Sequence, residues 1–267
     1  MSVRVLNVNG SPFEMNVEVV EGVLSLDTLF IHGNVASNTW WEPTLSELKK
    51  RKPEGRKLEG RFIAAEWRGC GRSGPPRAES ELSPKVLAQD YLALLDAMGI
   101  KKAVAVGHST GGAIALCAAL QDPSRFEKIV LLDSVGATGV QFAPETFEAF
   151  TQMSQNREFC AAVMGGTIHG NDPASPLFQR IVDDAFGIAK LNWHGVPRQL
   201  QNFNISKEIG SIRVPVLVLH GELDPVIPVE TAKTLAAALP NSRLEIFPNQ
   251  GHSPNVENPS LFVDYLL

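Results

Sequence analysis

The sequence predicts an α/β fold in which a mostly parallel central sheet carries helices on both faces and an inserted helical cap. Short apolar runs of the buried-strand kind alternate with segments that favour helix, which is typical of a parallel sheet covered on both sides. This alternation stops between Ser134 and Arg213, where helical patches follow one another over a length too great for a plain connection. We therefore expect residues 1–133 and 214–267 to form the core and residues 134–213 to form the cap.

The composition is that of an ordinary globular protein. Of the 267 residues, 44% are hydrophobic and 20% are charged, which leaves ample material for a buried core. A net charge of −5 lacks the basic footprint of nucleic-acid binding, and no apolar run reaches the length of a membrane span. Residues 1–7 lack the pattern of a signal peptide, so we expect a cytoplasmic protein without nucleic-acid or membrane partners. A homo-oligomer is compatible with the sequence.

Local patterns predict the elements one by one. Residues 3–8 and 15–20 cluster β-branched residues around the turn sequence Asn9-Gly10-Ser11-Pro12, which predicts a hairpin. A helix is expected over 84–98, because Ser83 offers an N-cap and Gly99 suits the end. Other expected strands cover 25–31, 62–67, 103–106, 128–133, 214–220 and 243–247; other helices cover 44–50, 113–120, 144–156, 177–188, 230–239 and 258–267; loops cover 51–57 and 69–76.

The most informative segment is Gly107-His108-Ser109-Thr110-Gly111-Gly112, in which Ser109 stands in the pattern G-x-S-x-G. An apolar strand pattern precedes it and a helical pattern follows it, so Ser109 is expected at a sharp strand-to-helix turn. Such an elbow strains the backbone and lifts the serine hydroxyl clear of the sheet, and small neighbours let strand and helix pass closely. A glycine-rich turn with a helix-capping serine is the alternative interpretation.

A serine hydroxyl needs a base to take its proton and a third group to orient that base. His252 and Asp224 each follow a predicted strand, and the carboxyl ends of parallel strands meet at one edge of a sheet. Taken singly, a loop histidine and an aspartate before a proline are ordinary features. Glu222 and Asp133 are the alternatives for the acid.

The developing oxyanion of an acyl transfer needs backbone N–H donors. One is expected from Thr110, directly after the serine, and the other from Asn34 in the loop that follows the strand at 25–31. A plain strand-to-helix turn is the alternative interpretation of that loop. His32 is expected to shape the loop rather than to take part in chemistry.

These motifs together resemble the α/β-hydrolase fold superfamily, in its single-domain, cap-bearing serine hydrolase form. The matching segments span nearly the whole chain and are His32-Gly33, Trp67-Arg68-Gly69-Cys70-Gly71-Arg72-Ser73, Gly107 to Gly112, His220 to Asp224 and Gly251-His252-Ser253-Pro254. The resemblance implies a two-step acyl transfer with Ser109 as nucleophile, His252 as base and Asp224 as acid. It implies no metal and no organic cofactor. The scattered cysteines Cys70, Cys117 and Cys160 likewise have no metal spacing.

The substrate is the least readable part of the sequence. A serine nucleophile separates the chain from haloalkane dehalogenases and epoxide hydrolases of this fold, which use aspartate, and Thr110 is unlike the tryptophan usual in proline aminopeptidases. We expect a small, hydrophobic ester or lactone. A carbon–carbon bond hydrolase of meta-cleavage products and a low-turnover receptor or interaction protein are the alternatives.

The cap is expected to supply the surface that selects the substrate. Phe142, Trp193 and His194 are the candidate substrate-binding residues. The cap cations Arg157, Lys190 and Arg198 are considered as partners for a substrate carboxylate, although solvated charges are commoner.

Overall fold

A computed structural model describes residues 2–6, 12–21, 24–51 and 60–267. Within these residues, eight strands form one sheet in the order β1-β2-β4-β3-β5-β6-β7-β8. Strand β2 pairs antiparallel with β1 and with β4, and all the other neighbouring strands, from β4 and β3 to β7 and β8, pair in parallel. The strands are β1 (Ser2–Leu6), β2 (Pro12–Glu21), β3 (Asp27–Ile31), β4 (Arg61–Ala65), β5 (Ala103–His108), β6 (Phe126–Leu132), β7 (Val216–Gly221) and β8 (Ser242–Phe247).

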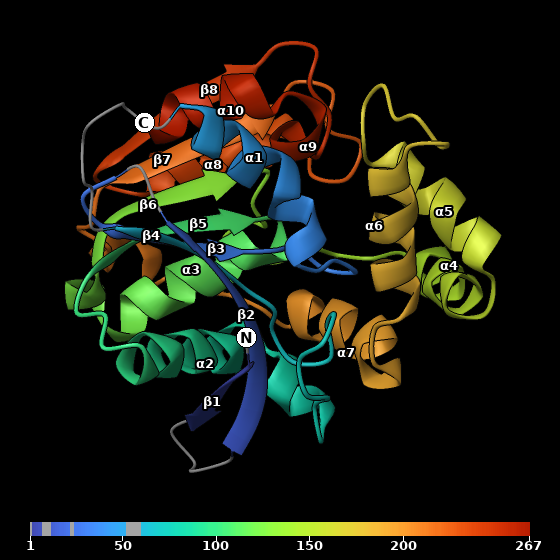
Figure 1. Ribbon diagram of the computed structural model, residues 1–267, viewed down its shortest axis with the longest axis horizontal. Coiled ribbons are helices and arrows are strands. Elements are labelled where there is room, and N and C mark those ends of the chain that lie inside the picture. Colours follow the sequence, from blue (N-terminus) through green and yellow to red (C-terminus); the bar gives the residue numbers. More distant parts are fainter. Residues whose placement is uncertain (1, 7–11, 22–23, 52–59) are drawn as a thin grey trace.

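Helices cover both faces of this sheet, and four of the described helices form a separate group between β6 and β7 (Figure 1). The sheet-covering helices are α1 (Glu42–Lys50), α2 (Pro84–Ala97), α3 (Thr110–Gln121), α8 (Val229–Ala238) and α10 (Pro259–Leu266), and the short α9 (Pro254–Glu257) precedes α10. The group between β6 and β7, called the inserted helices below, comprises α4 (Pro144–Gln155), α5 (Arg157–Gly166), α6 (Pro176–Phe186) and α7 (Lys190–Gln201).

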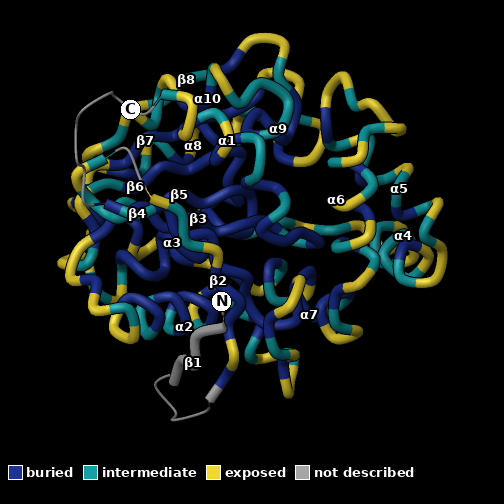
Figure 2. Tube along the Cα trace, in the orientation of Figure 1, coloured by how far each residue is buried: buried dark blue, intermediate teal, exposed yellow. Residues whose placement is uncertain are grey.

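Strand alternation divides the apolar residues of the sheet between two buried clusters. On β3, Leu29 and Ile31 belong to one cluster and Phe30 to the other, because successive side chains of a strand point to opposite faces. Helices α2, α3 and α8 cover the first face, and α1 and α10 cover the second. Figure 2 shows that most residues of the central strands are buried. Each fully buried Leu, Ile or Phe side chain stabilises the fold by about 1.5–3 kcal/mol.

The predicted mostly parallel sheet with helices on both faces is confirmed, and so is the opening hairpin, in which Val3 pairs with Met15. The turn predicted for that hairpin and the charged segment 52–57 lie outside the described residues. The helix over 84–98 begins and ends as predicted: the Ser83 hydroxyl accepts from the Val86 N–H at 3.3 Å, and Gly99 has φ +68°. None of the described helices has the length and apolar character needed to cross a bilayer.

Two of the inserted helices, α5 and α7, were not predicted. Helix α5 follows α4 after the single residue Asn156, whose side chain accepts from the Phe159 N–H at 3.0 Å, so the two helical patterns run together in the sequence. Helix α7 contains Pro197, which normally argues against a helix. That the inserted helices act as a cap stays a prediction.

A buried ion pair ties the loop after β4 to α2. The Arg68 side chain is 1% exposed and that of Asp90 is 0% exposed, with Nε–Oδ2 and Nη2–Oδ1 distances of 2.6 and 2.9 Å. Arg68 also donates to Glu81 at 3.0 Å, and its guanidinium lies 4.6 Å from the Phe13 ring centroid. The backbone carbonyl of Arg68 accepts from Asn192 Nδ2 at 2.8 Å, which extends the tie to α7.

Removing one partner of this pair should destabilise the protein strongly. We expect Arg68→Met to lower the free energy of unfolding by about 3–5 kcal/mol, because it leaves the Asp90 carboxyl buried without its cation. Urea denaturation would measure this loss. Combining Arg68→Met with Asp90→Asn should cost less than Arg68→Met alone, and Lys102→Met, which breaks an exposed ion pair with Glu127, should leave stability almost unchanged. Equal effects of the Arg68 and Lys102 variants would contradict this account.

Candidate active site

Ser109 lies between β5 and α3 in a strained backbone conformation. Its φ of +53° and ψ of −118° are rare for a residue other than glycine. Hydrogen bonds hold the turn on both sides: the Ser109 N–H donates to the Leu132 carbonyl at 2.9 Å, and the Ser109 carbonyl accepts from the Gly112 N–H at 3.0 Å. The predicted sharp strand-to-helix turn at Ser109 is therefore present.

Small residues permit this turn because the backbone segments touch. A side-chain carbon on Gly107 would collide with the carbonyl of Gly111, and one on Gly111 would collide with the carbonyl of Ile31. The second contact brings the end of β3 against the start of α3. The two glycines of G-x-S-x-G thus serve the close approach that the sequence predicted.

His252 and Asp224 come together at the same edge of the sheet, in the loops after β8 and β7. His252 Nδ1–H donates to Asp224 Oδ2 at 2.7 Å. Asp224 Oδ1 accepts the N–H groups of Val226 at 2.7 Å and Ile227 at 3.0 Å. Burial opposes ionisation of Asp224, but the hydrogen bonds from His252 and the two N–H groups outweigh it and lower the pKa of this carboxyl. With Nδ1 protonated, Nε2 of a neutral His252 ring is free to act as a base.

Two residues that the sequence did not single out hold the backbone around His252. His108 Nε2–H donates to the His252 carbonyl at 2.7 Å, and the two ring centroids are 4.9 Å apart. Burial lowers the pKa of His108 to about 3, so this ring is neutral. The Glu257 carboxylate accepts the N–H groups of Gly251 at 2.6 Å and Ser253 at 3.0 Å, on either side of His252. In the sequence, the one signal for His108 was its position next to Ser109, and Glu257 had none.

The loop after β3 lies directly beside the serine. A side-chain carbon on Gly33 would lie 3.0 Å from Ser109 Cβ, so the adjacent Asn34 is close to the nucleophile position. Thr110 begins α3, and the first N–H groups of a helix have no carbonyl partner within it. Both predicted oxyanion donors therefore lie at the serine. His32, as expected, stays inside the loop: its Nδ1–H donates to the Gly33 carbonyl at 2.9 Å, and burial lowers its pKa to about 4.

A cavity of about 240 Å³ joins these groups. Its lining includes the polar residues Ser109, His252, His108, Asn34 and Thr110. The remaining lining is almost wholly apolar, comes largely from the inserted helices and their flanking loops, and is made of Val35, Ala36, Trp40, Val135, Val140, Phe142, Thr146, Ala149, Phe150, Met153, Val163, Met164, Thr167, Leu200, Val226 and Ile227. No Asp, Glu, Lys or Arg is among the described residues that line this cavity.

The candidate substrate-binding residues separate into two groups. Phe142 lines the cavity. Trp193 is buried in the main hydrophobic cluster outside the cavity lining, and His194 stacks on Phe147 at a centroid distance of 6.0 Å, with its Nε2 3.1 Å from the Thr151 hydroxyl. Both side chains pack between α7 and its neighbours and neither lines the cavity, so the expectation that Trp193 and His194 bind substrate there is not supported.

The cap cations also lie outside the cavity lining. Arg157 pairs with Asp183 at 2.6 Å and Arg198 pairs with Glu79 at 2.6 Å, while Lys190 is exposed. Each arginine is therefore engaged by a neighbouring carboxylate on the surface. None of the three is placed to meet a carboxylate in the cavity.

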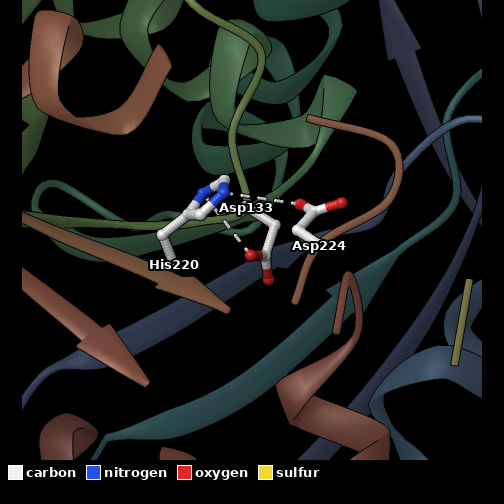
Figure 3. A group of neighbouring side chains, drawn as sticks. All are labelled: Asp133, His220 and Asp224. Carbon is white, nitrogen blue, oxygen red and sulfur yellow. Dashed lines mark ion pairs between the residues drawn. The ribbon is translucent and has the colours of Figure 1, made fainter. Parts of the chain in front are cut away.

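The alternative acids occupy different places. Glu222 is exposed and accepts the Asn249 N–H at 3.3 Å. Asp133 is buried beside Asp224 and His220, and the ligand atoms of these three side chains lie within 4.8 Å of one another (Figure 3). Within this cluster, His220 Nε2–H donates to the Ile227 carbonyl at 2.9 Å and Asp224 Oδ2 accepts from His252. Asp224 is thus the carboxylate in contact with His252.

The sequence and the fold of the chain are similar to those of known hydrolases. A family model described as the alpha/beta hydrolase fold matches residues 29–259. The chain is 29% identical over 208 residues to a 2-hydroxymuconate semialdehyde hydrolase of Pseudomonas putida, covering 76% of this chain and 74% of the relative. An esterase from Exiguobacterium antarcticum and a bromoperoxidase from Bacillus anthracis share the fold, with TM-scores of 0.85 and 0.84 at 21% identity; each alignment covers 100% of this chain and 98% of the other. The chain belongs to the α/β-hydrolase family.

Proposed function

We propose that the protein is a serine hydrolase that cleaves small, uncharged, hydrophobic esters or lactones through an acyl-enzyme on Ser109. The observation that carries the proposal is the shared cavity, in which a strained serine, a histidine hydrogen-bonded to a buried aspartate and two backbone donors meet an apolar wall. Each component has a place in acyl transfer, and the wall selects for substrates that lack charge.

In the first half-reaction, His252 Nε2 takes the proton of the Ser109 hydroxyl as the oxygen attacks the substrate carbonyl. The N–H groups of Asn34 and Thr110 hold the negative oxygen of the tetrahedral intermediate. Asp224 keeps Nδ1 of His252 protonated and stabilises the imidazolium. As the intermediate collapses, His252 gives its proton to the leaving alkoxide, and the acyl group stays on Ser109.

In the second half-reaction, water replaces the alcohol. His252 Nε2 takes a proton from the water while its oxygen attacks the acyl carbonyl, and the same two N–H groups hold the oxyanion. Collapse of this intermediate returns the proton to Ser109 and releases the carboxylic acid. A product carboxylate is disfavoured in an uncharged apolar cavity, because burial of an unpaired charge is costly, and this promotes its release.

The cavity wall favours this substrate class over meta-cleavage products, which carry a carboxylate. A bound carboxylate needs a cation or several donors. The described cavity lining offers no cation, and Arg157 and Arg198 are engaged elsewhere. The volume of about 240 Å³ is below the roughly 300–1,000 Å³ of common ligand sites, which favours a small substrate.

Ser109→Ala should abolish hydrolysis of p-nitrophenyl butyrate, lowering kcat by at least about 10³-fold, because it removes the hydroxyl that carries the acyl group. His252→Ala should fall to a similar level, since the two residues act as one unit. Release of p-nitrophenolate measures both, and labelling of Ser109 by a fluorophosphonate provides an independent readout. Wild-type turnover at the level of Ser109→Ala, without labelling, would favour the receptor or interaction protein instead.

Asp224→Asn should lower kcat by about 10⁴-fold while leaving the fold intact, because the amide cannot keep Nδ1 of His252 protonated. Glu222→Gln is the matched control, since it changes an exposed acid two positions away in the same loop. Steady-state kinetics and circular dichroism measure the two effects. Full activity in Asp224→Asn would refute the assignment of the acid.

Charge on the acyl chain tests the substrate class. We expect kcat/KM for p-nitrophenyl butyrate to exceed that for mono-p-nitrophenyl succinate by at least about 100-fold, because the succinate carboxylate loses its solvation without gaining a partner. The two acyl groups have the same number of carbons, so chain length is matched. Equal values, or efficient cleavage of a meta-cleavage product, would instead support the carbon–carbon hydrolase.

A further inference from the structure

Asp133 occupies an unusual position at the end of β6. Its backbone has a φ of +45°, its N–H donates to the Leu219 carbonyl at 3.0 Å, and its side chain is fully buried. One carboxyl oxygen, Oδ1, accepts the Gly221 N–H at 2.8 Å. The other, Oδ2, meets no N–H or O–H donor among the described residues. A buried carboxylate oxygen without a donor is costly, whereas the hydroxyl of a neutral carboxylic acid at that place needs only an acceptor.

The groups that face Asp133 supply no positive charge. Asp224 and His220 lie beside it, and Glu257 adds further negative potential. His220 is the only ion-pair partner within reach of Asp133 in the described part of the chain, at 3.5 Å from Nδ1 to Oδ1. Burial lowers the pKa of His220, and its Nε2–H is given to a backbone carbonyl, so this ring is neutral. Two buried carboxyl groups whose oxygens lie within 4.8 Å of one another, with no cation beside them, do not both ionise readily.

The number of donors decides which carboxyl keeps the proton. Asp224 accepts three hydrogen bonds, from His252, Val226 and Ile227, and each stabilises its charged form. Asp133 accepts one, from Gly221. Burial and the neighbouring Asp224 charge raise the pKa of Asp133 well above its ordinary value, which agrees with this count.

We propose that Asp133 is a positioning residue that stays protonated in the folded protein and donates a hydrogen bond from its carboxyl group to Asp224. The bond holds the Asp224 carboxylate in place for His252 and helps to keep it ionised. Figure 3 shows the side chains of Asp133, His220 and Asp224 gathered from three different segments, with His220 beside both carboxyl groups. The protonation of Asp133 does not depend on which substrate the protein hydrolyses. The role of Asp133 in catalysis, through Asp224 and His252, rests on the proposed function.

The proton on Asp133 is measurable without any substrate. An unfolded aspartate ionises near pH 4, so the wild-type chain takes up one proton at this site when it folds at neutral pH. The raised folded pKa makes wild-type stability fall as pH rises above about 4, whereas the amide of the Asp133→Asn variant takes up no such proton. The free energy of unfolding of Asp133→Asn relative to wild type should therefore rise steadily between about pH 4 and pH 7. Glu148→Gln, which changes an exposed acid on α4, is the control.

Activity tests the hydrogen bond. Asp133→Asn retains a neutral donor and should keep kcat within about threefold of wild type, while Asp133→Ala should lose about 10- to 100-fold in kcat with little change in KM. Rescue by the amide is the readout that a merely space-filling side chain would not give. The proposal is overturned if the stability difference of Asp133→Asn does not change with pH, or if the amide and alanine variants lose kcat equally. Loss of the proposed function would appear instead as Ser109-independent turnover, with the pH-dependent stability difference intact.

Discussion

The left-handed backbone of Ser109 is the constraint on which the site depends. Such a conformation costs about 1–3 kcal/mol in a non-glycine residue and persists only where its surroundings hold it. Here the strands on both sides of β5 supply that support, through the Ser109–Leu132 hydrogen bond toward β6 and the contact of Gly111 with Ile31 at the end of β3. The same contact fixes the distance between the serine and the loop that holds Asn34. The turn that carries Ser109, the proposed nucleophile, therefore also sets the place of Asn34, the proposed oxyanion donor.

Charge is distributed unevenly around this turn. The cavity lining is apolar and has no Asp, Glu, Lys or Arg among its described residues, whereas Asp133 and Asp224 lie together behind His252 and the Glu257 carboxylate binds the backbone beside it. In a medium of low polarity each hydrogen bond to Asp224 is stronger than it would be in water, and each unpaired charge is more costly. Within the pair of Asp133 and Asp224, a single negative charge surrounded by donors satisfies both conditions. The pairing of Asp133 with Asp224 is the consequence of placing two acids at the ends of adjacent strands β6 and β7.

The inserted helices together with their flanking loops form most of the cavity wall, and the loop between α5 and α6 contacts the loop that carries His252. The Glu257 carboxylate that holds the backbone around His252 accepts a further N–H, that of His169, from the loop between α5 and α6, at 3.0 Å. The Ser253 hydroxyl donates to the Thr167 carbonyl of the same loop at 3.4 Å. The loop between α5 and α6, which contributes Thr167 to the cavity wall, and the backbone around His252 are therefore joined by direct hydrogen bonds.

The parallel sheet, the strained elbow and the chain order of Ser109, Asp224 and His252 were readable from the sequence, because they depend on local periodicity and on the edge at which parallel strands end. The cavity lining was not. Phe142 and Trp193 are both large apolar residues in one inserted segment, and only the packing of the helices decides that the first faces the cavity and the second is buried elsewhere. Asp133 was readable only as a rival for Asp224. Its protonation depends on neighbours that come from distant parts of the chain, and the count of hydrogen-bond donors around each carboxyl exists only in the folded structure.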